Sequence, residues 1–343
     1  MKAKFLLSTL FFSSCLGLFG CSSKKRVVIL TALENDRLSL LKETLVTKFP
    51  NYEISIEYKN TGAMMGELKA RGVKTTADIF IDLEITNSEI LLSENRDLFC
   101  DLSDFDTSGY VDSVLEYQKD CVLSDTSTRK GHKKYNIMDK EAGCIMLNTK
   151  VLKDKGLEEP ESYADLLKPE YKDLVVMPNP KTSGTGYYFY NGYSSVYGHE
   201  AAVTYFSELS KNIKEFTTSG SQPIKSIDSG SAAIGLGMHF QARGYANKNP
   251  NIKIKFFEEG SPYTLFTMGI IKGKEVRPEV KEVYKYYFDE GNYLDNSNIC
   301  PETIYKNPLP PKVENWAFPH KYVDMKNLLD PIYKNKALDD WRN

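Results

Sequence analysis

Apolar and polar residues in the first hundred positions alternate between the spacing of strands and the spacing of helices. The β-branched run 26–33 predicts a strand, and apolar residues at helical spacing over 35–49 predict a helix. The same reasoning gives a strand at 52–58, a helix at 62–71, a strand at 77–81 and a helix at 88–94. This order is typical of the start of a doubly wound α/β sheet.

A second α/β set begins at position 142. Predicted strands cover 142–148, 174–180, 232–238, 252–258 and 265–271, and predicted helices cover 161–167, 185–197, 200–211, 223–229 and 278–288. We expect loops between 95 and 134 and in the proline-rich tail 301–319, with a short helix near the C-terminal end. The pattern indicates two α/β lobes joined by more than one crossing of the chain, with a cleft between them.

The first twenty residues differ from the rest of the chain. Two lysines precede an apolar run at 5–19 that is too short to span a membrane, so 1–20 is predicted to be a secretory signal peptide. The next residue closes a stretch, LFGC, that resembles a bacterial lipobox, which predicts a lipidated Cys21 and a polar tether over 21–25. A cleaved signal with an incidental cysteine is the alternative. No other apolar run approaches 18 residues, so we expect the rest to be soluble and held at a membrane by lipid alone.

Composition and motifs argue against two classes of function. The formal net charge is −2, which gives no electrostatic footprint for nucleic acid. The chain has neither a GxSxG nucleophile elbow nor a P-loop. Its four histidines, His132, His199, His239 and His320, have no metal-ligand spacing with one another or with cysteine. A membrane-tethered hydrolase is therefore a weak alternative, and a purely structural surface antigen is a third.

Four cysteines remain beyond the signal peptide and the lipobox cysteine Cys21. They are Cys100, Cys121, Cys144 and Cys300, and in an oxidising compartment an even number allows disulfides. Cys100 and Cys121 lie closest in sequence and flank loop-like stretches, so their pairing is the first choice. Four free buried thiols are the alternative.

Several stretches in a fixed order resemble a known family. After the lipobox come ADIF, GCIMLNTKVL, PESYADLLKPEYKDLVVMPNPKTSGTGY, SGSAAIGLGM and FEEGSPYTLFTMGIIKG. This order is similar to that of bacterial ABC-importer solute-binding lipoproteins, in the subgroup that contains ferric-iron binders and binders of phosphorylated or phosphonate solutes. The resemblance covers nearly the whole mature chain.

The resemblance implies a type II periplasmic-binding-protein fold, in which two doubly wound lobes enclose a ligand cleft. Lobe one would comprise 26–125 and 260–343, and lobe two would comprise 126–259. The implied function is capture of a small anionic or zwitterionic solute by lobe closure, followed by delivery to an ABC permease in the membrane. A protein of this kind is an exported monomer that faces the periplasm or the cell exterior, and it needs no catalytic residue and no cofactor.

The positions that hold iron ligands in the family hold other residues here. Ferric binders of this family use a histidine, a glutamate and two tyrosines, and the matching positions in this chain are Glu34, Leu83, Phe240 and Gln241. Fe(III) prefers phenolate and carboxylate oxygen, so nearby tyrosines could substitute. The candidates are Tyr187 and Tyr188, with Tyr190 and Tyr193 on the same predicted helix. Ferric iron is therefore the alternative ligand, and packing is the ordinary role of such tyrosines.

Three predicted helix starts are rich in small hydroxyl and glycine residues, which suits an anion. The first N–H groups of a helix have no partner within it and carry the positive end of its dipole. The candidate residues at these starts are Thr61, Gly62, Thr182, Ser183, Gly184, Thr185, Ser219 and Ser221. Each start could also be an ordinary N-cap, but convergence on one cleft, as in the family, favours shared use.

Acidic residues at predicted strand ends point to a ligand that also carries an amine. They are Glu34, Asp82, Glu84, Glu258 and Glu259, and most could be plain surface positions. If Glu34 or Asp82 faces the cleft, a zwitterion with its amine near these residues and its phosphoryl, phosphonate or carboxylate oxygens near 182–186 fits better than a dianion. We therefore count Glu34, Asp82 and Glu259 as candidate ligand residues, together with His239 on the expected cleft wall.

Overall fold

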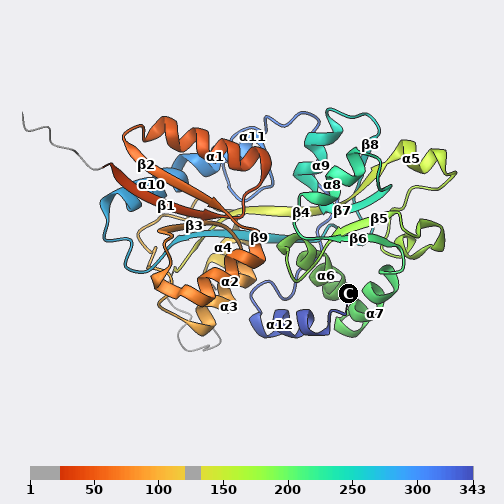
Figure 1. The fold of residues 1–343 in the computed structure, drawn as a ribbon, viewed down its shortest axis with the longest axis horizontal. Coiled ribbons are helices and arrows are strands. Elements are labelled where there is room, and N and C mark those ends of the chain that lie inside the picture. Colours follow the sequence, from red (N-terminus) through yellow and green to blue (C-terminus); the bar gives the residue numbers. More distant parts are fainter. Residues whose placement is uncertain (1–23, 120–132, 343) are drawn as a thin grey trace, which may run out of the picture.

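The computed structural model describes residues 24–119 and 133–342, and within them one mixed sheet runs through the whole molecule (Figure 1). Its strand order is β2-β1-β3-β9-β4-β7-β5-β6, with β8 paired to β4. The strands are β1 (Lys25–Thr31), β2 (Tyr52–Tyr58), β3 (Ile79–Glu84), β4 (Asn136–Asn148), β5 (Val175–Pro178), β6 (Ile213–Thr217), β7 (Ile234–Met238), β8 (Ile252–Lys255) and β9 (Tyr263–Ile270). The predicted signal peptide and Cys21 lie outside the described residues.

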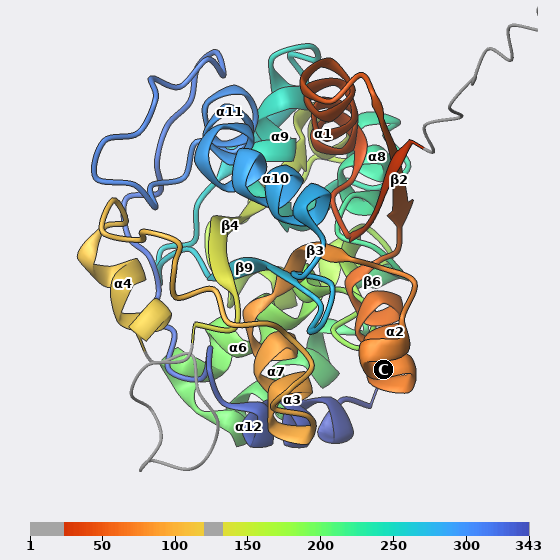
Figure 2. The ribbon, with the colours of Figure 1, turned by 90° about the vertical axis from the view of Figure 1, so that its left-hand side faces the viewer.

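Helices cover both faces of this sheet (Figures 1 and 2). One face carries α1 (Asn35–Lys48), α8 (Gln222–Asp228), α9 (His239–Ala246), α10 (Pro278–Tyr286) and α11 (Asn292–Asn298). The other face carries α2 (Thr61–Arg71), α3 (Ile85–Glu94), α4 (Asp112–Lys119), α6 (Gly184–Tyr197), α7 (His199–Leu209) and α12 (Pro331–Asp340), while α5 (Thr149–Asp154) lies at one end. The predicted α/β class is confirmed.

The long strand β4 joins two halves of the sheet. Its first part, 136–142, pairs antiparallel with β9, and its second part, 143–147, pairs antiparallel with β7. We call β2, β1, β3 and β9 the first half-sheet, and β7, β5, β6 and β8 the second. The first half-sheet is built from both ends of the described chain, because β9 pairs antiparallel with β3. The lobe boundaries expected from the sequence stay a prediction.

Several elements were missed or misplaced by the sequence prediction. Helix α4 lies in the region expected to be a loop, and α5, α9, α11 and β6 were not predicted. The predicted helix at 161–167 is only a 3-10 turn at Asp165–Leu167. Helix α11, NYLDNSN, has poor intrinsic propensity, and four of its seven residues are buried, so tertiary packing overrides propensity there.

The predicted disulfide between Cys100 and Cys121 is not formed. Cys100, Cys144 and Cys300 are free buried thiols, and Cys121 lies outside the described residues. Cys100 is 1% exposed and belongs to the main hydrophobic core, where it packs as a small apolar residue.

The C-terminal segment 331–342 contacts both halves of the molecule. In α12, the buried Lys334 pairs with Glu84, at the junction of β3 and α3. Beyond α12, the Trp341 ring packs against Phe206 and Phe216, with ring centroids 5.6 and 5.4 Å apart. This segment therefore links α3 to the second half-sheet and its helices (Figure 1).

Candidate functional site

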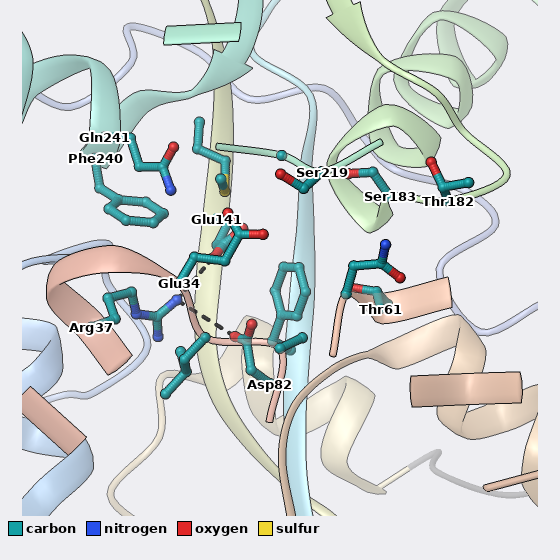
Figure 3. A pocket seen from close by; sticks show the side chains of 16 residues that line it. Glu34, Arg37, Thr61, Asp82, Glu141, Thr182, Ser183, Ser219, Phe240 and Gln241 are labelled. Atoms are coloured by element: carbon teal, nitrogen blue, oxygen red, sulfur yellow. Dashed lines mark hydrogen bonds and ion pairs between the residues drawn. The ribbon is translucent and has the colours of Figure 1, made fainter. Parts of the chain in front are cut away.

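A pocket lies between the two half-sheets, where the carboxyl ends of parallel strands face each other. Such ends are the usual ligand position in open α/β sheets. The residues that line it are Ala32, Leu33, Glu34, Arg37, Asn60, Thr61, Asp82, Glu141, Thr182, Ser183, Ser219, Gly220, Met238, Phe240, Gln241 and Phe266. Figure 3 shows that carboxylates gather on one side of the pocket and hydroxyl groups on the other.

The two halves of the molecule touch beside this pocket, at the starts of α2 and α6. A Cβ atom placed on Gly62 would lie 3.2 Å from the carbonyl oxygen of Thr182, and one on Gly184 would lie 3.2 Å from the Cβ atom of Glu84. Contacts this close leave no room for a side chain at either glycine unless its neighbour moves. The two halves are thus in a closed arrangement around the pocket.

The acidic side of the pocket is organised by Arg37, which lies in the first turn of α1. Its Nη1 donates to Glu141 Oε1 at 2.8 Å, and its Nε donates to Asp295 Oδ2 at 2.9 Å. Its Nη2 donates to Asp139, and Nη1 lies 3.5 Å from Asp82 Oδ1. One guanidinium therefore faces four carboxylates from β3, β4 and α11, and none of these five side chains is more than 7% exposed.

Local backbone geometry explains how the acids reach this position. Asp139 and Glu141 are two residues apart on β4, so both point to the same face of the strand. Asp82 lies at a register shift in β3, between Ile81 and Leu83, and its φ is +71°. Aspartate tolerates this left-handed conformation better than most residues, and a bulge re-aims the side chain. Strained backbone of this kind is concentrated at functional sites.

Burial and mutual repulsion disfavour ionisation of these acids. Burial raises the pKa of Asp139 to about 6, although the Arg37 cation opposes this shift. Burial likewise raises the pKa of Asp82 and of Glu141 well above their ordinary values, and neighbouring carboxylates add to the effect. For Arg37, burial disfavours the charged form, but attraction by Asp139 and the other acids holds its pKa well above the usual range.

Some oxygens on this acidic side have no hydrogen-bond partner among the described residues, although they are buried. They are Glu34 Oε2, Asp82 Oδ1, Asp139 Oδ1, Glu141 Oε2 and Gln241 Oε1. The other Glu34 oxygen, Oε1, accepts from the Tyr58 hydroxyl. Buried acceptors without donors are costly, so these atoms are complementary to a ligand that carries positive charge and N–H groups.

The opposite side of the pocket presents hydroxyl groups at the starts of two helices. At α2, Asn60 is the N-cap, and its side chain accepts from the Ala63 N–H at 2.8 Å. At α6, Ser183 is the N-cap, and its hydroxyl accepts from the Gly186 N–H at 3.4 Å. Of the three expected Ser or Thr caps, only Ser183 is confirmed, because Asn60 and not Thr61 caps α2, and Ser221 at the start of α8 makes no side-chain cap hydrogen bond. Thr61 and Thr182 line the pocket beside the first two helix starts.

The predicted ligand residues fall into three groups. Those that line the pocket are Glu34, Thr61, Asp82, Thr182, Ser183 and Ser219. Those beside it are Gly62, Gly184 and Thr185 at the helix starts and Ser221, which lines an adjoining hollow with Glu34 and Ser219. Those that do not line it are His239 and Glu259.

His239 and Glu259 have other packing roles. The His239 ring packs against Trp316 with centroids 4.1 Å apart, and its Nδ1 lies 3.3 Å from Glu302 Oε1. The Oε1 atom of Glu259 accepts from the backbone N–H of Tyr163 at 3.2 Å. A position at a strand end does not say which way a side chain faces, and these two face away from the pocket.

The alternative iron ligands Tyr187 and Tyr188 also do not line the pocket. Both are buried in the core, and burial raises the pKa of each phenol well above its ordinary value. The Tyr187 ring lies under the Lys334 ammonium, 4.2 Å from Nζ to the ring centroid. Neither phenol is therefore in a position to become a phenolate ligand in this pocket.

Sequence reasoning missed most of the acidic cluster. Arg37 was not singled out among the residues of the predicted helix at 35–49, and Asp295 lies in a helix that was not predicted. Glu141 and Asp139 precede the position where the strand was expected to begin. The signal that could have found them is the alternation in NIMDKEAG, which puts two acids on one face of a strand.

The Asp139 pKa predicts how the stability of the unliganded protein changes with pH. Because its folded pKa of about 6 is above its ordinary value of 3.8, the favourable contribution of this group is fully present below pH 3.8 and is lost as pH rises through 6. Compared with Asp139→Asn, the wild-type protein should lose unfolding free energy between pH 4 and pH 7. Urea unfolding of both proteins across this range measures the free energy of unfolding of each. If the wild type gained stability relative to Asp139→Asn as the pH rose, the assignment would be contradicted.

Comparison with known proteins identifies the fold. The chain is similar to the periplasmic binding protein AfuA from Actinobacillus pleuropneumoniae, solved with fructose-6-phosphate, with a TM-score of 0.78 and 19% identity over 93% of this chain and 98% of that one. A periplasmic thiamin binding protein matches with a TM-score of 0.75 and 14% identity over 94% and 97% of the two chains. An apo ferric ion-binding protein A from Pasteurella haemolytica matches with a TM-score of 0.66 and 17% identity over 92% and 96%.

These likenesses confirm the predicted type II periplasmic-binding-protein fold. Among curated sequences, an uncharacterized protein of Haemophilus influenzae is 25% identical over 282 residues, which are 79% of this chain and 75% of that protein. Within the described ranges, the structure has no helix with the length and apolar character needed to cross a membrane. The sequence model of the family described as bacterial extracellular solute-binding protein matches residues 101–317, so this chain belongs to that family.

Proposed function

We propose that this protein is the solute-binding component of an ABC importer and that it captures a small zwitterionic solute. The observation that carries the proposal is the pocket itself, in which buried carboxylate oxygens that have no donor among the described residues face a wall of hydroxyl groups. A solute with a cationic group at one end and an anionic group at the other matches both sides.

The cationic end of the solute would contact Glu34, Asp82 and Glu141. Each of these side chains lines the pocket and offers a buried oxygen that lacks a partner among the described residues. Arg37 supplies one positive charge to the cluster, which is fewer than the carboxylates it faces. A bound cation would offset the excess negative charge and the missing hydrogen bonds together.

The anionic end would lie against the starts of α2 and α6. Thr61, Thr182, Ser183 and Ser219 bring hydroxyl groups to this side of the pocket. The first N–H groups of α2 and α6 have no acceptor within their own helices and point with the positive end of the helix dipole. Phosphoryl, phosphonate and carboxylate oxygens accept such donors. A pure anion fits less well, because the acids opposite would repel it.

Capture would proceed by closure of two lobes. Strand β4 pairs with β9 of the first half-sheet and continues into the second, where it pairs with β7, so the crossing of β4 is the natural place for a hinge. The pocket is lined from both sides of this crossing, so a bound solute would stabilise the closed form. An ABC permease then reads the closed form, and no chemical conversion is needed.

Thermal unfolding with three matched probes tests this proposal. O-phosphoethanolamine at 1 mM should raise Tm by several degrees, whereas ethyl phosphate, which lacks the amine, and ethylamine, which lacks the phosphate, should have little effect. Phosphate release should stay at the background rate, since the protein binds without turnover. Strong stabilisation by ethyl phosphate with none by the zwitterion would overturn the zwitterionic assignment, and turnover would overturn the assignment as a binding protein.

We also propose that the mature chain is anchored by lipid on Cys21 and acts as a monomer. Replacing Cys21 with serine should move the protein from the membrane fraction to the soluble fraction, because no thiol remains to carry the acyl chains. Fractionation of cells that produce each form measures this. Retention of the serine variant at the membrane would contradict the anchor.

A further inference from the structure

We propose that the acidic side of the pocket selects a primary ammonium or guanidinium group and rejects a quaternary ammonium group or a bare metal ion. The inference rests on the proposed function and names the cation that the solute carries. It follows from which hydrogen-bond groups are present and which are already used.

The acidic side offers acceptors from four separate elements. Glu34 comes from the start of α1, Asp82 from β3, Glu141 from β4 and Gln241 from α9, and each has a buried oxygen without a partner among the described residues. Asp82 and Glu141 are 5% and 2% exposed, so water does not readily replace a missing donor. A single ligand group that carries several N–H donors could therefore satisfy these oxygens together.

Arg37 does not meet this need, because its N–H groups point at other oxygens. It donates to Glu141 through Oε1 and to Asp295 through both carboxylate oxygens, and it also donates to Asp139. The Asp82 Oδ1 atom is 3.5 Å from Nη1, an ion-pair distance at which no hydrogen bond is formed. The free oxygens are thus left for the ligand.

The spacing of the oxygens suits a tetrahedral ammonium. One oxygen from each of Asp82, Asp139 and Glu141 lies within 4.8 Å of the others, and of these three residues Asp82 and Glu141 line the pocket. An ammonium nitrogen that donates at about 2.8–2.9 Å along tetrahedral directions needs acceptors roughly 4.7 Å apart. A guanidinium group also spans such separations, since its donors form a planar fork.

A quaternary ammonium group lacks the N–H donors that the oxygens on this side of the pocket require. It has no N–H group, so it would leave the buried oxygens without donors, at a cost of about 1–3 kcal/mol for each. Such groups are held instead by aromatic faces. The aromatic side chains here are Phe240 and Phe266, and the Phe240 ring already faces the Arg37 guanidinium, with its centroid 5.4 Å from Cζ.

A bare metal ion is disfavoured by Arg37. The guanidinium lies within 3.5 Å of oxygens on Asp82, Asp139 and Glu141, which are the ligands that a metal would use. Metal binding would place a multiply charged ion beside a fixed cation, and repulsion at that distance in a buried site is large. An ammonium carries a single charge, and its N–H groups point at the acids.

Calorimetric titration with a methylation series tests the selectivity. The probes are O-phosphoethanolamine, its N-methyl and N,N-dimethyl forms, and phosphocholine. Because each methyl group removes one donor, affinity should fall stepwise and by at least about 100-fold from the first to the last. Thr182→Ala alters only the anionic side of the pocket. It should weaken the binding of each tightly bound probe by about the same factor, so the order of affinities along the methylation series should not change. Equal or tighter binding of phosphocholine overturns the inference while leaving the zwitterionic function intact.

A second series removes any dependence on the anionic part of the probe. Methylammonium, dimethylammonium, trimethylammonium and tetramethylammonium chloride, each at 100 mM and equal ionic strength, are compared for their effect on Tm in the wild type and in Asp82→Asn. Methylammonium should stabilise the wild type more than the variant, and the gap should vanish for tetramethylammonium. No gap for any of these cations, or a stronger stabilisation of the wild type by MgCl₂ or MnCl₂ than by methylammonium, overturns the inference.

Discussion

Glu141→Gln is expected to weaken solute binding strongly and to make the unliganded protein more stable. Glu141 lines the pocket, is 2% exposed and has a pKa raised well above its ordinary value by burial and by Asp139. Glutamine has nearly the same shape and can still accept from Arg37. It removes one carboxylate from a cluster in which four carboxylates face one guanidinium. Because burial and Asp139 disfavour the ionised form of Glu141, a neutral group of the same shape should raise the free energy of unfolding at neutral pH by on the order of 1 kcal/mol.

The same change should weaken capture of a cationic group by at least about 100-fold, because a neutral amide replaces a carboxylate that faces the ligand. The wild type should therefore have the lower Tm without O-phosphoethanolamine and the larger rise with it. Glu43→Gln is the matched control, since Glu43 is exposed on α1 and makes no hydrogen bond or ion pair seen in the described part of the chain. If Glu141→Gln lowered the Tm of the free protein and kept the ligand response, the acidic cluster would be structural and not a binding site.

Lys334→Met is expected to cost about 3–5 kcal/mol of unfolding free energy. Lys334 is 3% exposed in α12, and its ammonium pairs with Glu84, which is 0% exposed. Burial lowers the Lys334 pKa, and the Glu84 charge opposes this shift. Removing one partner of a buried pair leaves the other charge without its counterion, which is far more costly than losing a surface pair. Glu84 would keep hydrogen bonds from Thr86, Asn87 and Thr264 but lose its cation.

Lys336→Met is the control on the same helix. Lys336 is half exposed, and it pairs with Asp340 at 3.0 Å in a solvent-screened contact. Surface pairs of this kind contribute at most about 1 kcal/mol. Urea unfolding of the two variants measures the contrast. If the two substitutions cost the same, the link between α12 and α3 would not depend on the buried pair.

The sequence predicted the hydroxyl-rich helix starts of the pocket better than it predicted the residues of the acidic side. Helix starts are local features, so the caps at Asn60 and Ser183 follow from small polar residues before an amphipathic run. Asp82 was found because it ends an apolar strand. Side-chain direction is a tertiary property, so neither Arg37 turning inward from α1 nor His239 turning away from the pocket could be read from local pattern.

Charge pairing was the other limit. The sequence shows that Asp139, Glu141 and Asp295 exist, but only the fold places residues 139 and 295 beside the same guanidinium. Acidic residues are usually exposed to solvent, so the burial of this cluster could not be predicted from the sequence. Likewise, Cys100 and Cys121 are close along the chain, and only the packing of Cys100 in the core shows that its thiol is free.

The pairing of β9 with β3 also sets an order in time. The hydrogen bond from Thr267 to the carbonyl of Leu83 joins residues 184 positions apart, whereas the second half-sheet uses only residues between 143 and 255. Contacts so distant form slowly and only after the later strand has been synthesised. We therefore expect β1, β2 and β3 to lack their partner strand β9 while the middle of the chain folds. A fragment that ends before residue 260 would leave β3 with a bare edge, the kind of surface that recruits other chains.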